Sequence, residues 1–258
     1  MRQRLDVAMA EQGLVTSRSQ AESNVRLGKV KVNGQVVTKP AQPVSVEDKI
    51  TIAAEQQYVG RAALKLKSAD EIFKLDFRGK TVLDVGSSTG GFTQYVLLKG
   101  AERVIAVDVG TDQLHPALRG DPRIDLHEKT DIRNIWIMGA DLNDQKPEFR
   151  GLAVYVQGPI QVVVIDVSFI SLRDILPHIM HLISVNSIVL AMVKPQFEAG
   201  HSDIKHKGVI KNDHMRREVL KDFEMWVQKL FKVIDKADSE VAGSKGNVER
   251  FYMLRRLK

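Results

Sequence analysis

The fold of this chain is decided by the stretch Asp84-Val-Gly-Ser-Ser-Thr-Gly-Gly-Phe92. A run of apolar, strand-favouring residues leads into it at residues 81–85, and apolar residues at helical spacing continue to Lys99. Glycines in such a turn let the backbone approach a ligand closely, and ligands of open α/β sheets bind where a strand gives way to a helix. The stretch therefore predicts an α/β sheet with a ligand site at the end of this strand.

The spacing of the glycines argues against two common nucleotide-binding loops. The dinucleotide fingerprint G-x-G-x-x-G is broken because its third position is Ser88, and a Walker A loop is absent because no lysine follows the glycines. A nicotinamide oxidoreductase is therefore a distant alternative, and an ATPase is disfavoured. The next predicted strand ends in Asp108, where a carboxylate can accept hydrogen bonds from ribose hydroxyls.

Strand and helix patterns alternate through the rest of the chain. This alternation predicts a parallel sheet that helices cover on both faces. A helix with a core-facing apolar stripe is predicted over residues 213–231. The other predicted strands are residues 103–108, 124–128, 161–166 and 187–192, followed by a closing hairpin near 232–238 and 247–254.

The first part of the chain is predicted to form a small unit of its own. Two short helices come first, and Ser17-Arg-Ser-Gln20 is a capping-box pattern that opens the second helix, which Gly28 can close. Asn33-Gly34 is the strongest short-range signal for a hairpin, and residues 48–52 supply a third strand. We therefore predict one domain over residues 1–55, a polar linker over 56–61 and the α/β domain over 62–258.

The composition excludes several classes of protein. With 43% hydrophobic and 27% charged residues among 258, the chain can bury a core, so wholesale disorder is excluded. No apolar run approaches the roughly 18 residues needed to span a bilayer. The absence of cysteine excludes disulfides and thiolate metal sites, and with an N-terminus unlike a secretory signal it favours the cytoplasm. The 38 Lys and Arg against 32 Asp and Glu favour a polyanionic partner.

The small unit resembles an S4-type RNA-binding domain. The residues that carry the resemblance are Arg4-Leu5-Asp6, Ser17-Arg18, Ala21, Arg26-Leu-Gly-Lys-Val30 and Val32-Asn-Gly34. Such a domain implies contacts between its cations and RNA phosphates, whereas the plainer alternative is an ordinary solvated surface. The predicted RNA-binding residues are Arg4, Arg18, Arg26, Lys29 and Lys31.

An acid before a glycine-rich turn, with a second acid that ends the next strand, resembles the class I S-adenosylmethionine (SAM)-dependent methyltransferases, which have a Rossmann-like α/β fold. The resemblance implies that the glycines approach the methionine part of SAM, Asp108 the ribose and Asp131 the adenine amino group. The alternative for such a loop is tight packing of a strand on a helix. The predicted cofactor-binding residues are Asp84, Gly86, Ser87, Gly90, Gly91, Phe92, Asp108 and Asp131.

Four polar residues match, in chain order, the Lys-Asp-Lys-Glu tetrad of FtsJ-like ribose 2'-O-methyltransferases: Lys65, Asp166, Lys194 and Glu249. Enzymes that methylate base amino groups carry an Asn/Asp-Pro-Pro-aromatic loop after the fourth strand, where this chain has Asp166-Val-Ser-Phe169. Transfer to a ribose hydroxyl requires that its proton be removed near the transition state. We predict that Lys194 takes this proton and that Asp166 positions it, while Lys65 and Glu249 orient the ribose.

The order of these features is similar, nearly end to end, to the TlyA (haemolysin A) family of ribosomal RNA methyltransferases. That resemblance implies 2'-O-methylation of cytidine in ribosomal RNA with SAM and without a metal ion. The chain departs from the family pattern at Ser87 in place of alanine, at Asp131 in place of asparagine and in a longer stretch before Asp166. Two alternatives remain, a non-catalytic RNA-binding or ribosome-assembly factor and a haemolysin-like membrane-active protein, although the missing apolar span disfavours the latter.

Overall fold

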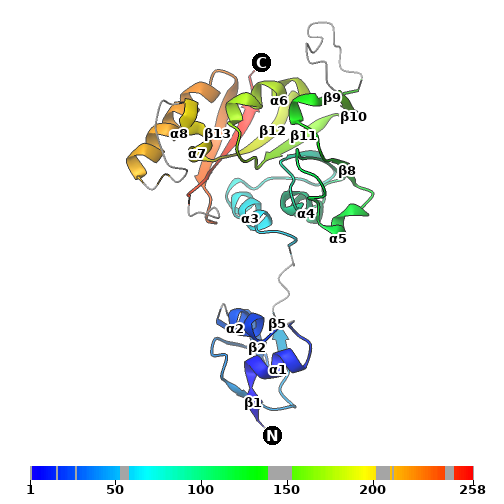
Figure 1. Ribbon diagram of the computed structural model, residues 1–258, viewed down its shortest axis with the longest axis vertical. Coiled ribbons are helices and arrows are strands. Elements are labelled where there is room, and N and C mark those ends of the chain that lie inside the picture. Colours follow the sequence, from blue (N-terminus) through cyan, green and yellow to red (C-terminus); the bar gives the residue numbers. More distant parts are fainter. Residues whose placement is uncertain are drawn as a thin grey trace. The chain divides into compact units, whose positions relative to one another are not determined.

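The computed structural model describes residues 2–15, 17–26, 28–52, 58–138, 153–201, 210, 212–241 and 247–257. The chain forms two compact units, Met1–Gln57 and Tyr58–Lys258 (Figure 1). Within the described ranges, no helix is both long enough and apolar enough to cross a membrane. Each unit has its own hydrophobic core.

The first unit has the two helices and the hairpin that the sequence predicts. The hydroxyl of Ser17 accepts a hydrogen bond from the Gln20 amide at 3.2 Å, as an N-cap does. Asn33 and Gly34 both have positive φ angles, 52° and 84°, which a tight two-residue hairpin requires. The elements are α1 (Leu5–Glu11), α2 (Arg18–Arg26), an antiparallel sheet of β2 (Val30–Val32), β3 (Gln35–Val37) and β5 (Ile50–Ile52), and a separate pair of β1 (Gln3–Arg4) with β4 (Pro43–Val44), which the sequence did not predict.

The second unit is built on a seven-stranded sheet of order β13-β14-β12-β11-β6-β7-β8. Every pairing from β12 to β8 is parallel, and only β14 runs antiparallel to its neighbours. The prediction of a parallel α/β sheet with a closing hairpin is therefore confirmed. The strands are β6 (Thr81–Val85), β7 (Arg103–Val107), β8 (Ile124–His127), β11 (Ile160–Ile165), β12 (Ile183–Val193), β13 (Phe231–Asp238) and β14 (Arg250–Arg256).

Helices cover both faces of this sheet (Figure 1). Apolar side chains of α3 and α4 pack with one set of alternating strand residues, and those of α6 and α8 pack with the other set. The main helices are α3 (Ala62–Phe73), α4 (Gly91–Leu98), α6 (Leu176–Leu182) and α8 (Asp213–Val227), and the shorter elements are α5 (Pro116–Arg119), η1 (Ile132–Asn134), η2 (Leu172–Asp174), α7 (Pro195–Glu198), η3 (Ala199–His201) and the parallel pair of β9 (Ile135–Ile137) with β10 (Val154–Val156).

The predicted end of the long helix at Phe231 is wrong. The helix α8 ends at Val227, and Phe231 instead begins β13, opposite Arg256 of β14. Phe231 is fully buried in the same cluster as the apolar face of α8. Its apolar character therefore continues the helical pattern although its backbone belongs to the edge of the sheet.

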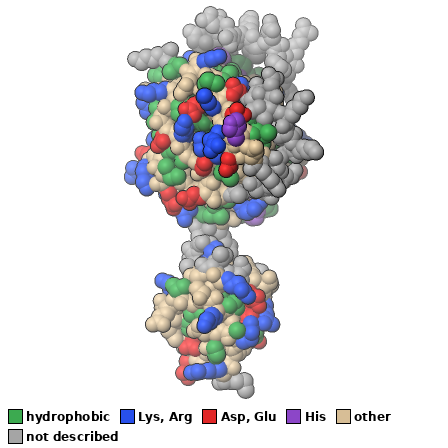
Figure 2. Space-filling view, turned by 90° about the vertical axis from the view of Figure 1, so that its left-hand side faces the viewer, with side chains coloured by type: hydrophobic (Ala, Val, Ile, Leu, Met, Phe, Trp, Pro, Cys, Tyr) green, Lys and Arg blue, Asp and Glu red, His purple; other side chains and the backbone are tan. Residues whose placement is uncertain are grey.

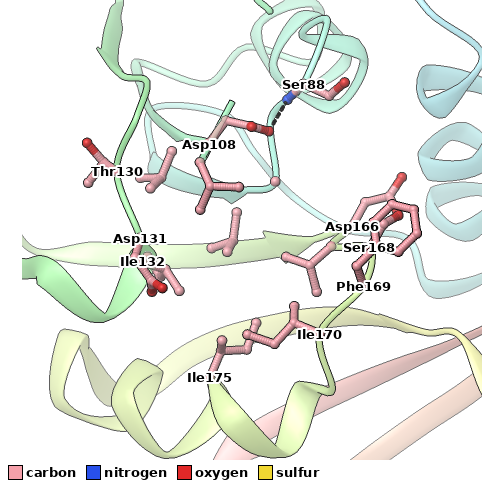
Figure 3. Close-up of a pocket in the computed structure, with 15 residues that line it drawn as sticks. Ser88, Asp108, Thr130, Asp131, Ile132, Asp166, Ser168, Phe169, Ile170 and Ile175 are labelled. Atoms are coloured by element: carbon pink, nitrogen blue, oxygen red, sulfur yellow. Dashed lines mark hydrogen bonds between the residues drawn. The ribbon is translucent and has the colours of Figure 1, made fainter. Parts of the chain in front are cut away.

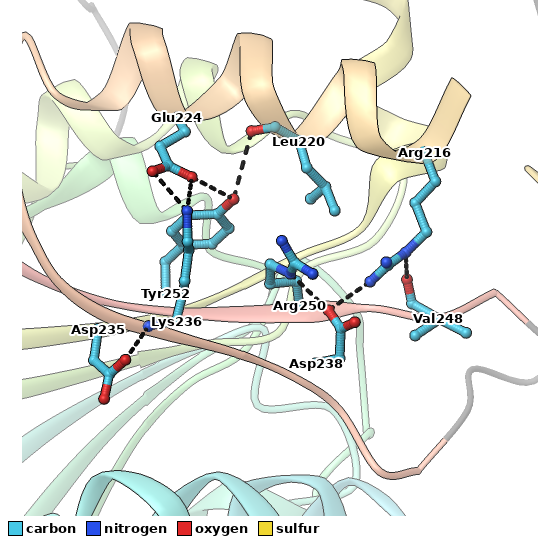
Figure 4. A network of polar contacts seen from close by, with 9 residues as sticks. All are labelled: Arg216, Leu220, Glu224, Asp235, Lys236, Asp238, Val248, Arg250 and Tyr252. Carbon is cyan, nitrogen blue, oxygen red and sulfur yellow. Dashed lines mark hydrogen bonds and ion pairs between the residues drawn. The ribbon is translucent and has the colours of Figure 1, made fainter. Parts of the chain in front are cut away.

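Ion pairs fasten α8 to the last two strands (Figure 4). Arg216 at the start of the helix and Arg250 of β14 both donate to the same Asp238 oxygen at 2.6 Å. One turn beyond the middle of the helix, Glu224 accepts two hydrogen bonds from Lys236 of β13 at 2.7 and 2.6 Å. The basic residue Arg216 is therefore part of the fold's own charge network.

Candidate active site

A cavity of about 270 Å³ lies at the carboxyl edge of the sheet, where β6, β7 and β11 end (Figure 3). Polar side chains of the loops after these strands face it together with an apolar wall from the loop after β11. Parallel strands bring their carboxyl ends to one edge, which is where ligands of this kind of sheet bind. The side chains labelled in Figure 3 are Ser88, Asp108, Thr130, Asp131, Ile132, Asp166, Ser168, Phe169, Ile170 and Ile175.

The glycine-rich loop comes into close contact with the loop after β11. Gly86 has a φ of 81°, and a Cβ atom added there would lie 2.6 Å from the backbone oxygen of Asp166. No side chain fits in that space, so only glycine allows the two loops to approach. This contact joins the predicted cofactor loop to the predicted catalytic loop, and both Gly86 and Asp166 line the cavity.

The carboxylate of Asp108 is fixed beside this loop. One oxygen accepts a hydrogen bond from the Ser88 amide at 2.8 Å, and the other accepts one from the Gly110 amide at 2.7 Å. Two backbone donors hold the side chain in one orientation at the end of β7. Asp108 therefore presents a fixed acceptor to the cavity, at the place where the sequence predicts a ribose contact.

Asp131 also lines the cavity and keeps its negative charge. Its carboxylate accepts hydrogen bonds from the Arg133 backbone at 2.9 Å and from the Arg133 guanidinium at 2.9 and 2.6 Å. These bonds from Arg133 lower the pKa of Asp131 below its usual value. The same bonds cap the 3₁₀ turn η1 and fix the position of the acid.

Of the eight predicted cofactor residues, three line the cavity: Gly86, Asp108 and Asp131. The other five, which do not line it, are Asp84, Ser87, Gly90, Gly91 and Phe92. Gly91 permits close helix packing, since an added Cβ would lie 2.9 Å from both Ala62 Cβ and the Ala63 amide of α3. The ring of Phe92 packs beside that of Phe251, with centroids 6.5 Å apart.

Asp84 lies beneath the loop and is fully buried. One of its oxygens accepts a hydrogen bond from the Thr93 hydroxyl at 2.6 Å, and the other has no hydrogen-bond partner among the described residues. Burial raises the pKa of Asp84 to about 7. Its contact with Thr93 links the end of β6 to the first turn of α4.

Three polar residues of the cavity were missed at the sequence level: Ser88, Thr130 and Ser168. Each stands within two positions of a predicted residue, on a loop that follows a strand. Serine and threonine are common in loops, so their type alone gave no signal. Their place directly after a strand end was the only available clue.

The four predicted catalytic residues form two ion pairs. The Nζ atom of Lys194 lies 2.7 Å from Asp166 Oδ1 and donates a hydrogen bond to the Ser168 hydroxyl at 2.7 Å. The Nζ atom of Lys65 donates to Glu249 Oε2 at 2.5 Å. None of these four side chains is more than 14% exposed. Each lysine is thus held by a carboxylate at a site largely shielded from water.

The sheet brings these two pairs to the same edge. In the antiparallel pairing of β12 with β14, Val193 lies opposite Arg250, so the next positions of the same register are Lys194 and Glu249. Asp166 directly follows β11, which is the other neighbour of β12. Lys65 reaches Glu249 from α3. Residues far apart in the sequence therefore meet because the ends of β11 and β12 lie beside the start of β14.

In the first unit, a buried acid orients two of the predicted RNA-binding cations. The side chain of Asp6 is fully buried and accepts hydrogen bonds from Arg4 and from Arg18, each at 2.9 Å. The bonds from Arg4 and Arg18 lower the pKa of Asp6 despite its burial. Arg26 and Lys31 are exposed, and Lys29 is half-buried. Figure 2 shows Lys and Arg side chains on the visible surface of this unit.

In comparisons with known proteins, each of the two units matches a protein family. The model of the FtsJ-like methyltransferase family matches residues 58–256, and that of the S4 domain matches residues 3–50. The chain is 36% identical to the 16S/23S rRNA (cytidine-2'-O)-methyltransferase TlyA of Mycobacterium tuberculosis, over 98% of this chain and 90% of that relative. The chain belongs to the TlyA family of FtsJ-like methyltransferases.

Other TlyA relatives carry two kinds of name. One is the 23S rRNA (cytidine-2'-O)-methyltransferase TlyA of Campylobacter jejuni, 40% identical over 76% of this chain and 70% of the relative. Another is Hemolysin A of Brachyspira hyodysenteriae, 35% identical over 95% of this chain and 97% of the relative. A solved protein from Streptococcus thermophilus that carries a hemolysin name superposes with a TM-score of 0.66 at 33% identity, over 100% of this chain and 89% of that chain. The predicted resemblance to the TlyA family and the Rossmann-like methyltransferase fold are confirmed.

Proposed function

We propose that this protein transfers the methyl group of SAM to the ribose 2'-hydroxyl of a cytidine in ribosomal RNA. The observation that carries the proposal is the pair of buried lysine–carboxylate contacts, Lys194 with Asp166 and Lys65 with Glu249, of which Asp166 lines the cavity. Names of TlyA relatives from M. tuberculosis and C. jejuni support the choice of acceptor and of RNA. The exposed cations of the S4 domain support RNA as the partner.

The residues around the cavity fit SAM. Asp108 offers a fixed carboxylate to a ribose diol, and Gly86 lets the loop after β6 lie against Asp166 at the wall of the cavity. Asp131 offers an acceptor to an exocyclic amine, beside the apolar side chain of Ile132 against which a purine can pack. When bound, SAM supplies a methyl group made electrophilic by its sulfonium.

Lys194 is the proposed proton acceptor. Its amine is held by Asp166 and Ser168, two residues that line the cavity. In the proposed step, the neutral Nζ atom of Lys194 would take the proton of the 2'-hydroxyl as the oxygen forms its new bond to the methyl carbon, and the bond from that carbon to the sulfonium sulfur would break, leaving the thioether S-adenosylhomocysteine. Asp166 stabilises the ammonium that results.

Lys65 and Glu249 are proposed to position the acceptor ribose. Their close contact at 2.5 Å fixes both side chains beside Lys194. A fixed donor and a fixed acceptor can each bind a ribose oxygen, and correct orientation of the reacting oxygen lowers the barrier to transfer.

The test uses RNA that lacks a single hydroxyl. Mass spectrometry of ribosomal RNA from cells with and without the protein identifies the modified nucleotide. A fragment with a 2'-deoxy substitution at that nucleotide should bind the protein and accept no methyl group, while the unsubstituted fragment is methylated. Methylation of the deoxy fragment at the same nucleotide would mean that the acceptor is a base atom. Binding of SAM without any transfer would favour the non-catalytic RNA-binding factor.

A further inference from the structure

The two loops that carry Asp166 and Lys194 are joined at a second place, away from these residues. Glu198, at the end of α7, accepts a hydrogen bond from the Ser171 hydroxyl at 2.5 Å and one from the Leu172 amide at 2.7 Å. Its side chain is 1% exposed. A carboxylate this deeply buried is costly unless its bonds are well formed, so the contact fixes the geometry between the two loops.

The short helix α7 connects Glu198 to Lys194. Lys194 is the N-cap of α7, and its carbonyl oxygen accepts hydrogen bonds from the amides of Phe197 at 2.9 Å and Glu198 at 3.3 Å. Lys194 and Glu198 are therefore the two ends of a single hydrogen-bonded turn. Along the other loop, Asp166 and Ser171 are five positions apart. The loops thus form a closed ring, with Lys194–Asp166 at one end and Glu198–Ser171 at the other.

A cation of the same loop, Arg173, balances the buried charge. The Nε atom of Arg173 lies 3.6 Å from Glu198, and its Nη2 donates to Asp222 of α8 at 2.7 Å. The guanidinium also lies over the ring of Trp226, 5.5 Å from its centroid. The charge of Glu198 is therefore compensated within the protein, while its carboxylate accepts the bonds from Ser171 and Leu172.

We propose that Glu198 is a positioning residue for methyl transfer, which sets the contact of Lys194 with Asp166 by clamping the loop after β11 to the turn of α7. This inference rests on the proposed function of Lys194 and Asp166 and adds a residue that touches neither the cavity nor the acceptor. Precise support of reacting groups matters because displacement of a catalytic group by about 1 Å can cost about 100-fold in rate.

The first experiment measures single-turnover methylation of ribosomal RNA at saturating SAM. Glu198→Gln keeps the size of the side chain but removes the negative charge that faces Ser171 and Arg173. We expect methyl transfer to be about 10- to 100-fold slower in this variant. Asp222→Asn is the matched control, because it removes the outer partner of Arg173 and leaves Glu198 in place; its rate should stay within about twofold of wild type.

A double variant separates positioning from general support of the fold. If Glu198 acts through the Lys194–Asp166 contact, then Glu198→Gln added to Asp166→Ala should slow transfer by less than about twofold, because the contact is already lost. If Glu198 merely stabilises the protein, the rate losses of the two single variants should multiply in the double variant. The proposal would be overturned if Glu198→Gln slowed transfer by the same factor in the Asp166→Ala background as it does in the wild-type protein.

The second experiment does not depend on RNA or on methyl transfer. Trace acetylation of lysines, read by mass spectrometry, should label Lys194 several-fold faster in Glu198→Gln than in wild type, with Lys236 as the internal reference. Asp222→Asn should leave the ratio unchanged. Equal labelling of Lys194 in wild type and Glu198→Gln would overturn the clamp.

If Glu198→Gln does not fold, Ser171→Ala replaces it, because that change removes one of the two bonds and retains the carboxylate. A smaller change in the same direction is then expected, and unchanged labelling of Lys194 overturns the proposal. If wild-type protein methylates no RNA, the proposed function fails by itself, whereas the labelling experiment still decides whether Glu198 positions Lys194.

Discussion

Lys194 and Lys65 are each paired with a carboxylate, but only Lys194 is proposed to accept the proton of the 2'-hydroxyl. We predict that Lys194→Ala lowers the single-turnover rate of methyl transfer by about 10²- to 10⁴-fold, which is the usual contribution of general base catalysis. Lys194→Arg should not restore the rate, because a guanidinium keeps its proton at working pH. Calorimetry should give near-normal SAM affinity for both variants. Full activity of Lys194→Arg would instead assign Lys194 a purely electrostatic role.

The buried acid Asp84 should make the stability of the second unit depend on pH. Its pKa is raised to about 7 in the folded protein, whereas an unfolded chain has the ordinary value near 4. Between these values the folded state holds a proton that the unfolded state has released, so this group's contribution to stability falls as pH rises from about 4 to 7. Asp84→Asn removes the ionisation and still accepts the Thr93 hydroxyl.

We therefore expect the free energy of unfolding of Asp84→Asn, relative to wild type, to increase by up to about 4 kcal/mol between pH 4 and pH 8. Urea unfolding followed by tryptophan fluorescence measures this, since both tryptophans, Trp136 and Trp226, lie in the second unit. Parallel stability curves for the two proteins would mean that Asp84 has the same pKa in the folded and the unfolded chain.

Among the elements, the packing of α3 on α4 depends on Gly91. An added Cβ would lie 2.9 Å from atoms of Ala62 and Ala63, so α3 must move outward if Gly91 becomes alanine. We predict that Gly91→Ala destabilises the second unit by about 1–3 kcal/mol and slows methyl transfer, because α3 carries Lys65. Gly120→Ala is the control, since a Cβ there meets nothing within 4 Å. Equal urea midpoints for the two variants would show that α3 adapts without cost.

The sequence predicted those elements whose signals are local. The hairpin at Asn33-Gly34 and the strand at residues 81–85 were found because turn chemistry and apolar runs lie within a few residues. The start of β12 at Ile183 and the end of α8 were not, because pairing with distant strands decides them. The two lysine–carboxylate pairs came from matching an ordered family pattern, and no periodicity pointed to them.

The predicted cofactor residues show the same limit. Asp108 was found because it ends a strand, and its carboxylate does line the cavity. Gly91 and Phe92 belong to the same motif but face α3 and Phe251, because a helix turns successive side chains to different sides. A linear motif therefore pointed to the loop without telling which of its residues line the cavity.

For the whole molecule, the two units are predicted to divide the work of binding. The double variant Arg26→Glu, Lys31→Glu reverses two exposed charges of the first unit and should weaken binding to ribosomal RNA. The slope of the logarithm of the binding constant against the logarithm of the salt concentration should become shallower by about two. SAM affinity should not change, because these residues belong to a separate compact unit. Lys229→Glu with Lys232→Glu imposes the same charge change on the second unit as a control. Equal losses for both pairs would mean that net charge alone governs RNA binding.

The reversed strand β14 has a consequence for the time at which this protein becomes competent. It enters the sheet between β12 and β13, and the residue before it, Glu249, completes the contact with Lys65. Proteins emerge from the ribosome with the N-terminal part first, and domains fold as their segments become available. Glu249 is the last of the four residues to be translated. A nascent chain can thus have its S4 domain and its glycine-rich loop ready while the site is still open, so each molecule acquires its chemistry only after the segment that carries β14 has been made.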